Sequence, residues 1–221
     1  MANYFSYVPE IDYVNRFPNA KIGEYNRAKN LFTRAKIRDD IFQDLSNFTK
    51  YSIVGDERPD NVSYAYYGDA TYDWLVLLAN NVVDVYSEWP MTQQSFDTFL
   101  LNKYGTYGEI DGVHHYESIK VTNSRGIKVL DAGLTVPSNF SVTYFDSGLG
   151  TEVTKTNITR EITNRVFEDK LEDKKRNIYL LKKEYLNMIT QDVKNVLKYK
   201  EGSTQYVSRT LKRVDNIRLY Q

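Results

Sequence analysis

The chain has 221 residues, with 29 basic and 29 acidic side chains and no cysteine. This length allows one domain or two small ones, and a formal net charge of zero argues against a nucleic-acid-binding protein. The absence of cysteine excludes a disulfide framework, a thiolate zinc site and a cysteine nucleophile. The longest apolar run, residues 74–79, is far shorter than the ~20 residues that span a bilayer, and no signal peptide is visible. We therefore expect a protein that forms in a cytoplasm and stays soluble or joins an assembly there.

The charges are unevenly distributed along the chain. Residues 1–150 carry 13 basic and 19 acidic side chains, whereas residues 151–221 carry 16 basic and 10 acidic ones. Either the two halves neutralise each other within the chain, or each faces an oppositely charged partner.

The first 49 residues predict an N-terminal arm followed by a helix. Residues 1–30 are rich in Tyr, Phe, Asn and Pro, and Pro9 and Pro18 interrupt any long element. We expect an extended arm that lies on another surface. Apolar residues at near-helical spacing then predict a helix over residues 30–49.

Residues 50–105 predict a compact folded core with a following helix. A short strand near residues 51–54 precedes a helix that starts around Asp60 and ends at Gly68. Thr71 is expected to cap a second helix, and Val82, Val83 and Val85 predict a returning strand. A third helix is expected from Gln93 to Lys103, behind the N-cap Thr92 and before Gly105.

The rest of the chain is expected to form a β-rich region over residues 106–181, then a C-terminal helix and a basic tail over residues 182–221. Short β-type runs are separated by turns, including a hairpin-like turn at residues 123–126. Residues 159–181 fit either a helix or a hairpin, and we favour the hairpin because residues 178–181 form a short apolar run. An amphipathic helix is predicted over residues 183–199, and the last twenty residues are expected to be extended. The fold class is therefore α+β, with segments 1–49, 50–105, 106–181 and 182–221.

The sequence offers little chemistry for catalysis. Glu109, Asp111, His114 and His115 are the one metal-like cluster, but adjacent His residues on a strand should point to opposite faces. Adjacent carboxylates such as Asp56 and Glu57 are better explained by capping and solvation, and no phosphate-binding loop or nucleophile elbow occurs. Basic groups near residues 174–183 are interleaved with acids, which is typical of a solvated surface. We expect no enzyme activity, no cofactor and no metal, and no nucleic-acid, membrane or small-molecule partner.

Aromatic residues are the strongest positive signal. The chain has 19 Tyr, and five aromatic side chains fall within residues 64–74. Either these pack beneath neighbouring elements, or some are exposed as anchors for protein or sugar contacts.

Residues 53–60, 66–68 and 74–80 resemble a LysM-like module, a unit with the order strand, helix, helix, strand. More specifically, Gly55, Arg58, Pro59, Tyr67, Gly68 and Trp74, followed by Asp84-x-Tyr86-x-x-Trp89-Pro90, resemble the baseplate wedge protein family of contractile-tailed bacteriophages, of the gene product fifty-three type. A glycan-binding LysM module normally has a Gly-x-x-Leu-x-Ile-Pro-like second strand, which is not found here. The resemblance therefore favours protein contacts over peptidoglycan binding.

The resemblance implies a structural subunit of a tail baseplate in the virion. It would clamp neighbouring wedge proteins and adjacent wedges, and help wedges join into a ring around the hub. The residues expected to hold the folded body are Gly55, Arg58, Pro59, Tyr67, Gly68, Trp74 and Asn80. Phe5, Tyr7, Tyr86 and Trp89 are expected to contact neighbouring proteins. The alternative is a module that binds peptidoglycan or a related glycan.

Overall fold

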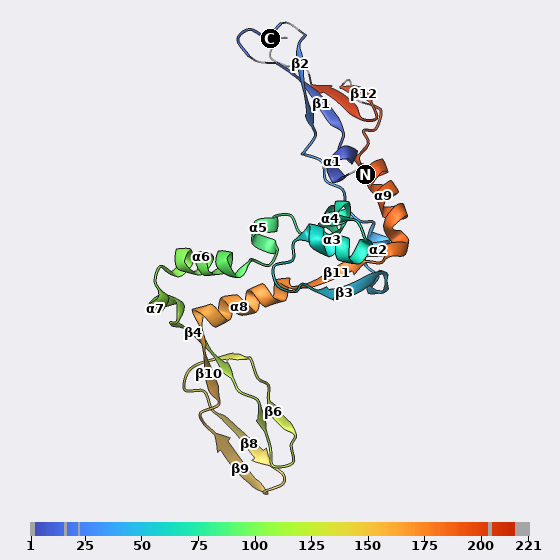
Figure 1. The fold of residues 1–221 in the computed structure, drawn as a ribbon. Coiled ribbons are helices and arrows are strands. Elements are labelled where there is room, and N and C mark those ends of the chain that lie inside the picture. Colours follow the sequence, from blue (N-terminus) through green and yellow to red (C-terminus); the bar gives the residue numbers. More distant parts are fainter. Residues whose placement is uncertain (1–2, 16, 22, 203–204, 215–221) are drawn as a thin grey trace. The chain divides into compact units, whose positions relative to one another are not determined.

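The structure is a computed structural model that describes residues 3–15, 17–21, 23–202 and 205–214. It combines helices with several small sheets of short strands, which confirms the predicted α+β class (Figure 1). Within these ranges, no helix has the length and apolar character needed to cross a membrane.

The chain folds into two units. Unit 1 comprises residues 1–89 and 177–221, and unit 2 comprises residues 90–176. Unit 2 is thus inserted into the sequence of unit 1. Neither boundary coincides with a boundary of the four predicted segments, so that finer division stays a prediction.

Unit 1 contains helices on both sides of the insertion and two separate sheets. Its helices are α1 (Tyr4–Tyr7), α2 (Asp39–Phe42), α3 (Pro59–Tyr67), α4 (Asp73–Ala79), α5 (Val85–Glu88) and α9 (Leu186–Leu197), with 3-10 turns at Leu45–Asn47, Ala70–Tyr72 and Lys183–Tyr185. Its strands are β1 (Glu10–Val14), β2 (Tyr25–Lys29), β3 (Phe48–Ser52), β11 (Asn177–Leu181), β12 (Tyr206–Ser208) and β13 (Leu211–Val214).

The segments expected to be extended arms instead pair with each other. The sheet has the order β12-β13-β1-β2, and β1 lies parallel to β13, with Glu10 opposite Leu211. Arg27 on β2 bonds the buried carboxylate of Asp12, whose pKa is lowered mainly by that hydrogen bond. Both segments thus contain extended strands, and part of the surface on which each lies is supplied by the other.

The predicted helix over residues 30–49 was also wrong. Only α2 and the turn Leu45–Asn47 are helical there. The Asn30 side chain accepts a hydrogen bond from the Phe32 amide, and Asp44 does the same for Ser46. Such local bonds compete with a continuous helix, although Ala35, Ile37 and Ile41 are buried.

The central part of unit 1 has the order strand, helix, helix, strand, but with an unexpected last strand. β3 pairs antiparallel with β11, with Tyr51 opposite Ile178. The expected strand over Val82–Val85 does not form, because Asp84 caps α5 by accepting from the Tyr86 amide. The partner of β3 therefore comes from beyond the insertion.

Two predicted helix starts in this region were shifted. Asp60 lies inside the first turn of α3, whose N-cap is Arg58 and whose first residue is Pro59. Asp69, rather than Thr71, caps the turn that leads into α4. Gly68 ends α3 as predicted, with a left-handed φ of 86°.

Unit 1 has two apolar clusters. One joins Trp74, Leu75 and Leu181 to the inner face of α9, whose residues Ile189, Val193 and Leu197 are buried. The other lies between α3, α4 and the β3–β11 pair and includes Val62, Val76 and Leu180. The amphipathic helix predicted over residues 183–199 is confirmed by α9 and the turn before it.

Unit 2 begins with helical elements and continues as short strands. Its elements are α6 (Gln93–Tyr104), α7 (Tyr107–Ile110), β4 (Val113–Ser118), β5 (Val121–Thr122), β6 (Lys128–Leu130), β7 (Thr135–Val136), β8 (Val142–Asp146), β9 (Thr151–Lys155), β10 (Thr159–Thr163) and α8 (Asn164–Lys175). α6 confirms the predicted helix, with Thr92 as its N-cap and Gly105 as its C-cap.

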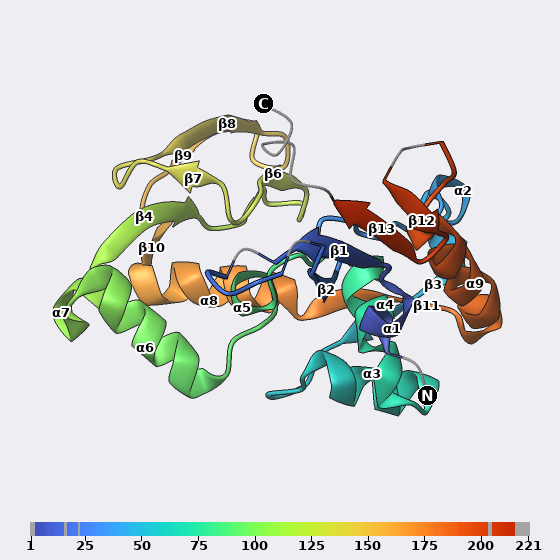
Figure 2. The same ribbon diagram turned by 90° about the horizontal axis from the view of Figure 1, so that it is seen from above.

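The favoured hairpin over residues 159–181 is replaced by strand, helix, strand. β10 pairs with β4, whereas β11 pairs with β3, and α8 separates them (Figure 2). The Thr163 side chain caps α8 at the Val166 amide. The helix, which was the alternative to the hairpin, is thus present in the middle of this segment, where Val166, Phe167 and Leu171 lie in α8.

The strands of unit 2 form three small sheets: β10-β4-β7, β5-β6 and β8-β9. A buried carboxylate joins the last two. Asp146 accepts hydrogen bonds from the Ser124 amide and hydroxyl and from the Gly148 and Leu149 amides. A Cβ on Gly148 would collide with Ser124 Oγ, so the two turns fit closely only with glycine there.

Candidate protein-contact surfaces

The predicted Gly55-Arg58-Pro59 motif forms the entry to α3. Gly55 has a left-handed φ of 61°, and Pro59 occupies the first turn, where its missing N–H costs nothing. Glu57 lies between them and accepts hydrogen bonds from the Tyr51 hydroxyl and the Val54 amide. The Glu57 carbonyl also accepts a hydrogen bond from Trp89 Nε1 at 2.9 Å. This segment therefore ties β3, α3 and the end of α5 together.

Tyr67 joins α3 to β11. Its hydroxyl donates to the Leu181 carbonyl at 2.9 Å, and its ring contacts Tyr66 and Tyr72 edge-on. Burial raises the pKa of the Tyr67 hydroxyl, with a smaller contribution from Tyr66. Tyr67 thus stays a neutral donor in the core.

Trp74 is the centre of the larger apolar cluster. It is buried, and its indole ring lies against Tyr4 and Tyr7 of α1, with ring centroids 5.9 and 6.3 Å away. Its Nε1 has no hydrogen-bond partner among the described residues. Trp74 therefore fixes α1 on α4 by packing alone.

Asn80 closes the outer edge of β11. Its amide nitrogen donates to the carbonyls of Val76 and Tyr179, and its carbonyl oxygen accepts from the Tyr179 amide at 2.8 Å. The Asn80 side chain thus occupies the amide and the carbonyl of Tyr179, to which a further strand at this edge could otherwise bond. The structure brings all the predicted motif residues into unit 1, around the β3–β11 pair and helices α3 and α4.

The four residues predicted to contact neighbouring proteins differ in how far they are exposed. Tyr86 on α5 is 92% exposed and Phe5 on α1 is 56% exposed. Tyr7 is half-buried against Trp74, and Lys194 lies over its ring. Trp89 is buried and bonded to Glu57, so a contact role for it stays a prediction that its burial does not favour.

A groove of about 510 Å³ in unit 1 was not predicted. Trp74, Leu77 and Leu78 of α4 line it together with Phe5 and Leu31. The neighbouring Phe32 is 99% exposed. Asn30 was the residue in the sequence that could have indicated this groove, because its side chain forms a turn that places Leu31 and Phe32 outside a helix. The near-helical spacing of apolar residues over residues 30–49 led to a predicted helix instead of this turn.

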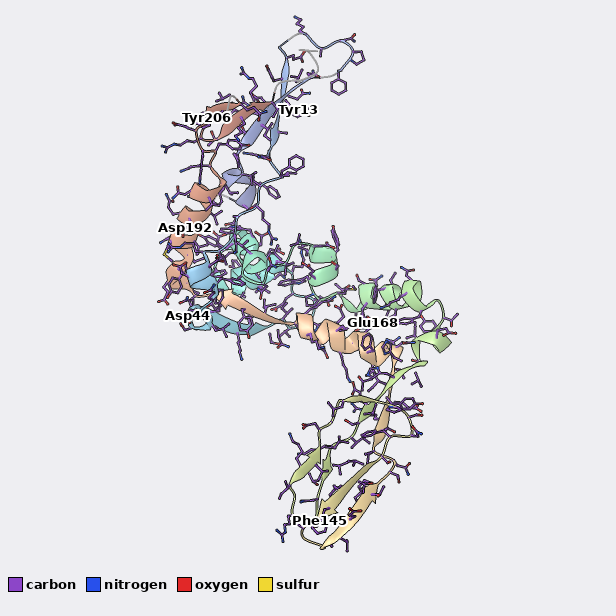
Figure 3. All side chains as sticks on the ribbon, turned by 180° about the vertical axis from the view of Figure 1, so that it is seen from behind. Tyr13, Asp44, Phe145, Glu168, Asp192 and Tyr206 are labelled. Atoms are coloured by element: carbon purple, nitrogen blue, oxygen red, sulfur yellow. The ribbon has the colours of Figure 1, made fainter. Side chains whose placement is uncertain are left out.

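Unit 2 has an apolar tip, which we define as Ile127, Phe145 and Leu149. All three side chains are more than half exposed, and they lie on or beside the two turns that Asp146 joins. Figure 3 shows Phe145 at the end of the β8–β9 hairpin away from α8. Large apolar side chains on a firmly bonded turn are suited to protein contacts.

The His pair in unit 2 lies differently from the expectation. His114 is the extra residue of a bulge opposite Ile162 and Thr163, so the alternation of the strand is broken. His114 Nδ1 therefore lies 2.8 Å from His115 Nδ1, and the His114 ring stacks on Phe167. Within the part of the chain described, no three His, Cys, Asp or Glu side chains are placed to hold a metal.

A buried carboxylate beside the His pair is used for structure. Glu117 bonds Lys170, Arg160 and His115, and the pKa of Glu117 is lowered first by the Lys170 hydrogen bond. Lys103 and Tyr104 bond the buried Glu168 in the same unit. These carboxylates join strands and helices by ion pairs.

The surfaces described are apolar, aromatic and exposed, which is the composition of protein interfaces. Residues 4–131 match the family described as base plate wedge protein 53 of bacteriophages, over more than half of the chain. The chain belongs to this family, and it is therefore a structural protein of a phage tail baseplate. No curated protein matches it. The matched region contains β3, α3 and α4, but β11 lies beyond it.

Proposed function

We propose that this chain clamps neighbouring wedge proteins of the baseplate and helps wedges join into a ring around the hub. The family supports a structural role in the baseplate, and the clamp is the finer inference. The observation that carries it is the presence of separate exposed apolar surfaces on each unit. Unit 1 has the groove beside Phe5 and Leu31, and unit 2 has the apolar tip.

Two surfaces on one chain favour bridging, because the second contact forms at a high effective concentration once the first is made. Phe145 and Phe5 are exposed aromatic side chains, a residue class that is enriched at protein interfaces. Contacts with other wedge proteins would bury both. The partners proposed are therefore wedge subunits on either side of the chain.

The proposal is tested in purified tail particles. We expect mass spectrometry to find the chain in fixed ratio to other baseplate proteins, and imaging to place it at the baseplate. Charged substitutions in either surface, Phe5→Glu or Phe145→Glu, should each abolish bridging but leave binding through the other surface. A chain absent from particles would contradict the proposal.

The glycan-binding alternative has one supporting observation, the strand, helix, helix, strand order of β3, α3, α4 and β11. A pull-down on peptidoglycan, run beside the particle analysis, separates the two. Retention on the cell wall with absence from particles would replace the structural proposal by a glycan-binding one.

A further inference from the structure

Unit 1 carries two surfaces of opposite charge. Residues 51–89, which include α3, α4 and α5, contain seven acidic side chains and a single basic one, Arg58. Residues 177–214, which include α9 and the β12–β13 hairpin, contain eight basic and three acidic side chains. In the described residues, no ion pair joins these two regions. Some of these charges are used inside unit 1, since Arg58 pairs with Asp60 and Asp192 pairs with Arg38. The others, which form no ion pair with a described residue, remain for another molecule.

The acidic region projects one well-formed knob, which we define as residues 83–88. Its apolar side chains Val83 and Tyr86 are 69% and 92% exposed. Asp84 accepts from the Tyr86 amide, and Glu88 accepts from the Val83 and Asp84 amides. The knob is held by its own hydrogen bonds, so the Tyr86 ring is presented without support from a neighbouring element.

The basic region has four basic residues whose backbone or side chain adjoins Tyr199. Lys198 and Lys200 flank it, the Tyr199 amide donates to the Arg209 carbonyl at 2.9 Å, and Lys212 lies over the Tyr199 ring at 4.9 Å. None of these four cations forms an ion pair with a described residue. We call this group the Tyr199 surface.

The knob and the Tyr199 surface cannot meet within one chain. Figures 1 and 2 both show α5 and α9 at opposite sides of the α3–α4 pair. Two complementary surfaces on opposite sides of one body favour a contact between copies that repeats head to tail, the type that closes rings.

We propose that the knob of one copy docks on the Tyr199 surface of a second copy. This proposal rests on the proposed role in joining wedges, and it names the partner as this chain itself. The contact we propose is of a type that also occurs within the chain, where a cation lies over the ring of Tyr7, Tyr25, Tyr66 and Tyr199. Tyr86 offers the same aromatic face to a second copy, and Asp84 and Glu88 add opposite charge.

The test is sedimentation of the full chain over a range of concentrations. We expect the average mass to rise beyond a dimer, and the association to weaken about tenfold or more between about 0.05 M and about 0.5 M salt. Tyr86→Ser, or Lys200→Glu with Arg209→Glu, should each weaken association at least about tenfold. Because each variant keeps one intact surface, mixing the two should restore a complex that stops at two chains.

Matched controls separate this contact from general charge effects. Tyr107→Ser removes an exposed ring from unit 2, and Lys120→Glu with Lys155→Glu makes the same change in net charge as the double substitution in the Tyr199 surface. Both controls should associate as the original chain does. A chain that stays monomeric in low salt, variants that stay apart on mixing, or duplex DNA bound by the Tyr199 surface in place of a second copy would overturn the proposal. The particle analysis could still succeed in each case, so the two proposals fail separately.

Discussion

The core of unit 1 and the β-region of unit 2 are stabilised by different chemistry. Unit 1 buries Trp74, Leu75 and many further apolar side chains in two clusters. The strands of unit 2 bury few apolar residues, and they are joined instead by the buried carboxylates of Glu117 and Asp146. Small sheets whose strands are too few to enclose an apolar core can thus be held together by hydrogen bonds to buried carboxylates.

The two units can be followed separately. Both Trp residues, Trp74 and Trp89, lie in unit 1, and both His residues, His114 and His115, lie in unit 2. Tryptophan fluorescence therefore reports the unfolding of unit 1, and the His ring signals in NMR report unit 2. The stability of each unit can therefore be measured by its own probe.

The largest effect is expected from Leu75→Ala in α4. Leu75 is fully buried, and truncating such a leucine costs about 2–5 kcal/mol because it removes apolar contacts and leaves a cavity. Denaturant unfolding followed by fluorescence should shift to lower concentration, whereas the His signals should keep their midpoint. Equal shifts of both probes would show that the units unfold as one.

The next effect is a change in acid sensitivity on Asp146→Asn. Hydrogen bonds from Ser124 are the main cause that lowers the pKa of Asp146 to about 2, below its ordinary value of 3.8. The ionised carboxylate therefore stabilises unit 2 above about pH 4, and that contribution is lost as the pH falls towards 2. The Asp146→Asn variant should have a lower unfolding free energy of unit 2 at neutral pH. That free energy should no longer fall through the titration of residue 146 as the pH is lowered from about 4 towards 2.

His signals measured from neutral pH to pH 2 test this expectation. Asp131→Asn is the control, because Asp131 is an exposed carboxylate of the same unit, and it pairs with the exposed Lys128. An unchanged acid profile in the Asp146 variant would contradict the assigned role of this carboxylate.

A smaller effect is expected from Asn80→Ala in unit 1. The change removes three hydrogen bonds and leaves the Tyr179 backbone groups to water, since this edge is partly exposed. A loss of about 1–2 kcal/mol in the unfolding free energy of unit 1 is expected. Asn61→Ala, at an exposed position of α3, should leave that free energy nearly unchanged. Faster amide exchange confined to β11 would locate the loss.

The smallest effect is expected from Tyr86→Ser. The ring is 92% exposed, so both probes should keep their midpoints to within about 0.5 kcal/mol. Fluorescence and His signals of the purified variant measure this directly. A large destabilisation would show that Tyr86 belongs to the fold rather than to a contact surface.

Sequence reasoning succeeded where the determining interactions are local. The N-cap Thr92, the C-caps Gly68 and Gly105, and the inner stripe of α9 act within one or two turns of their own helix. The motif around Gly55, Tyr67 and Asn80 was also recognisable, because its residues fall within one short stretch.

Sequence reasoning failed where an element depends on a distant one. Val82–Val85 has strand composition, yet β3 pairs with β11, more than a hundred residues further along the chain. The parallel pairing of β1 with β13 likewise joins segments far apart in the sequence, although β1 also pairs with the nearby β2 and β13 with the nearby β12. The groove beside Leu31 was missed for the same reason, since its lining residues come from separate parts of unit 1.

The insertion of unit 2 also fixes the order in which the protein can form during translation. A ribosome makes the chain from residue 1 onwards, so unit 2, which is contiguous, can fold as soon as Arg176 has emerged. β3 must wait until β11 has been synthesised, whereas β1 can pair at once with β2 and gains its second neighbour, β13, only later. The unit that begins first is therefore completed last, and the nascent β3 remains without its strand partner in the meantime, which gives a chaperone time to act on it.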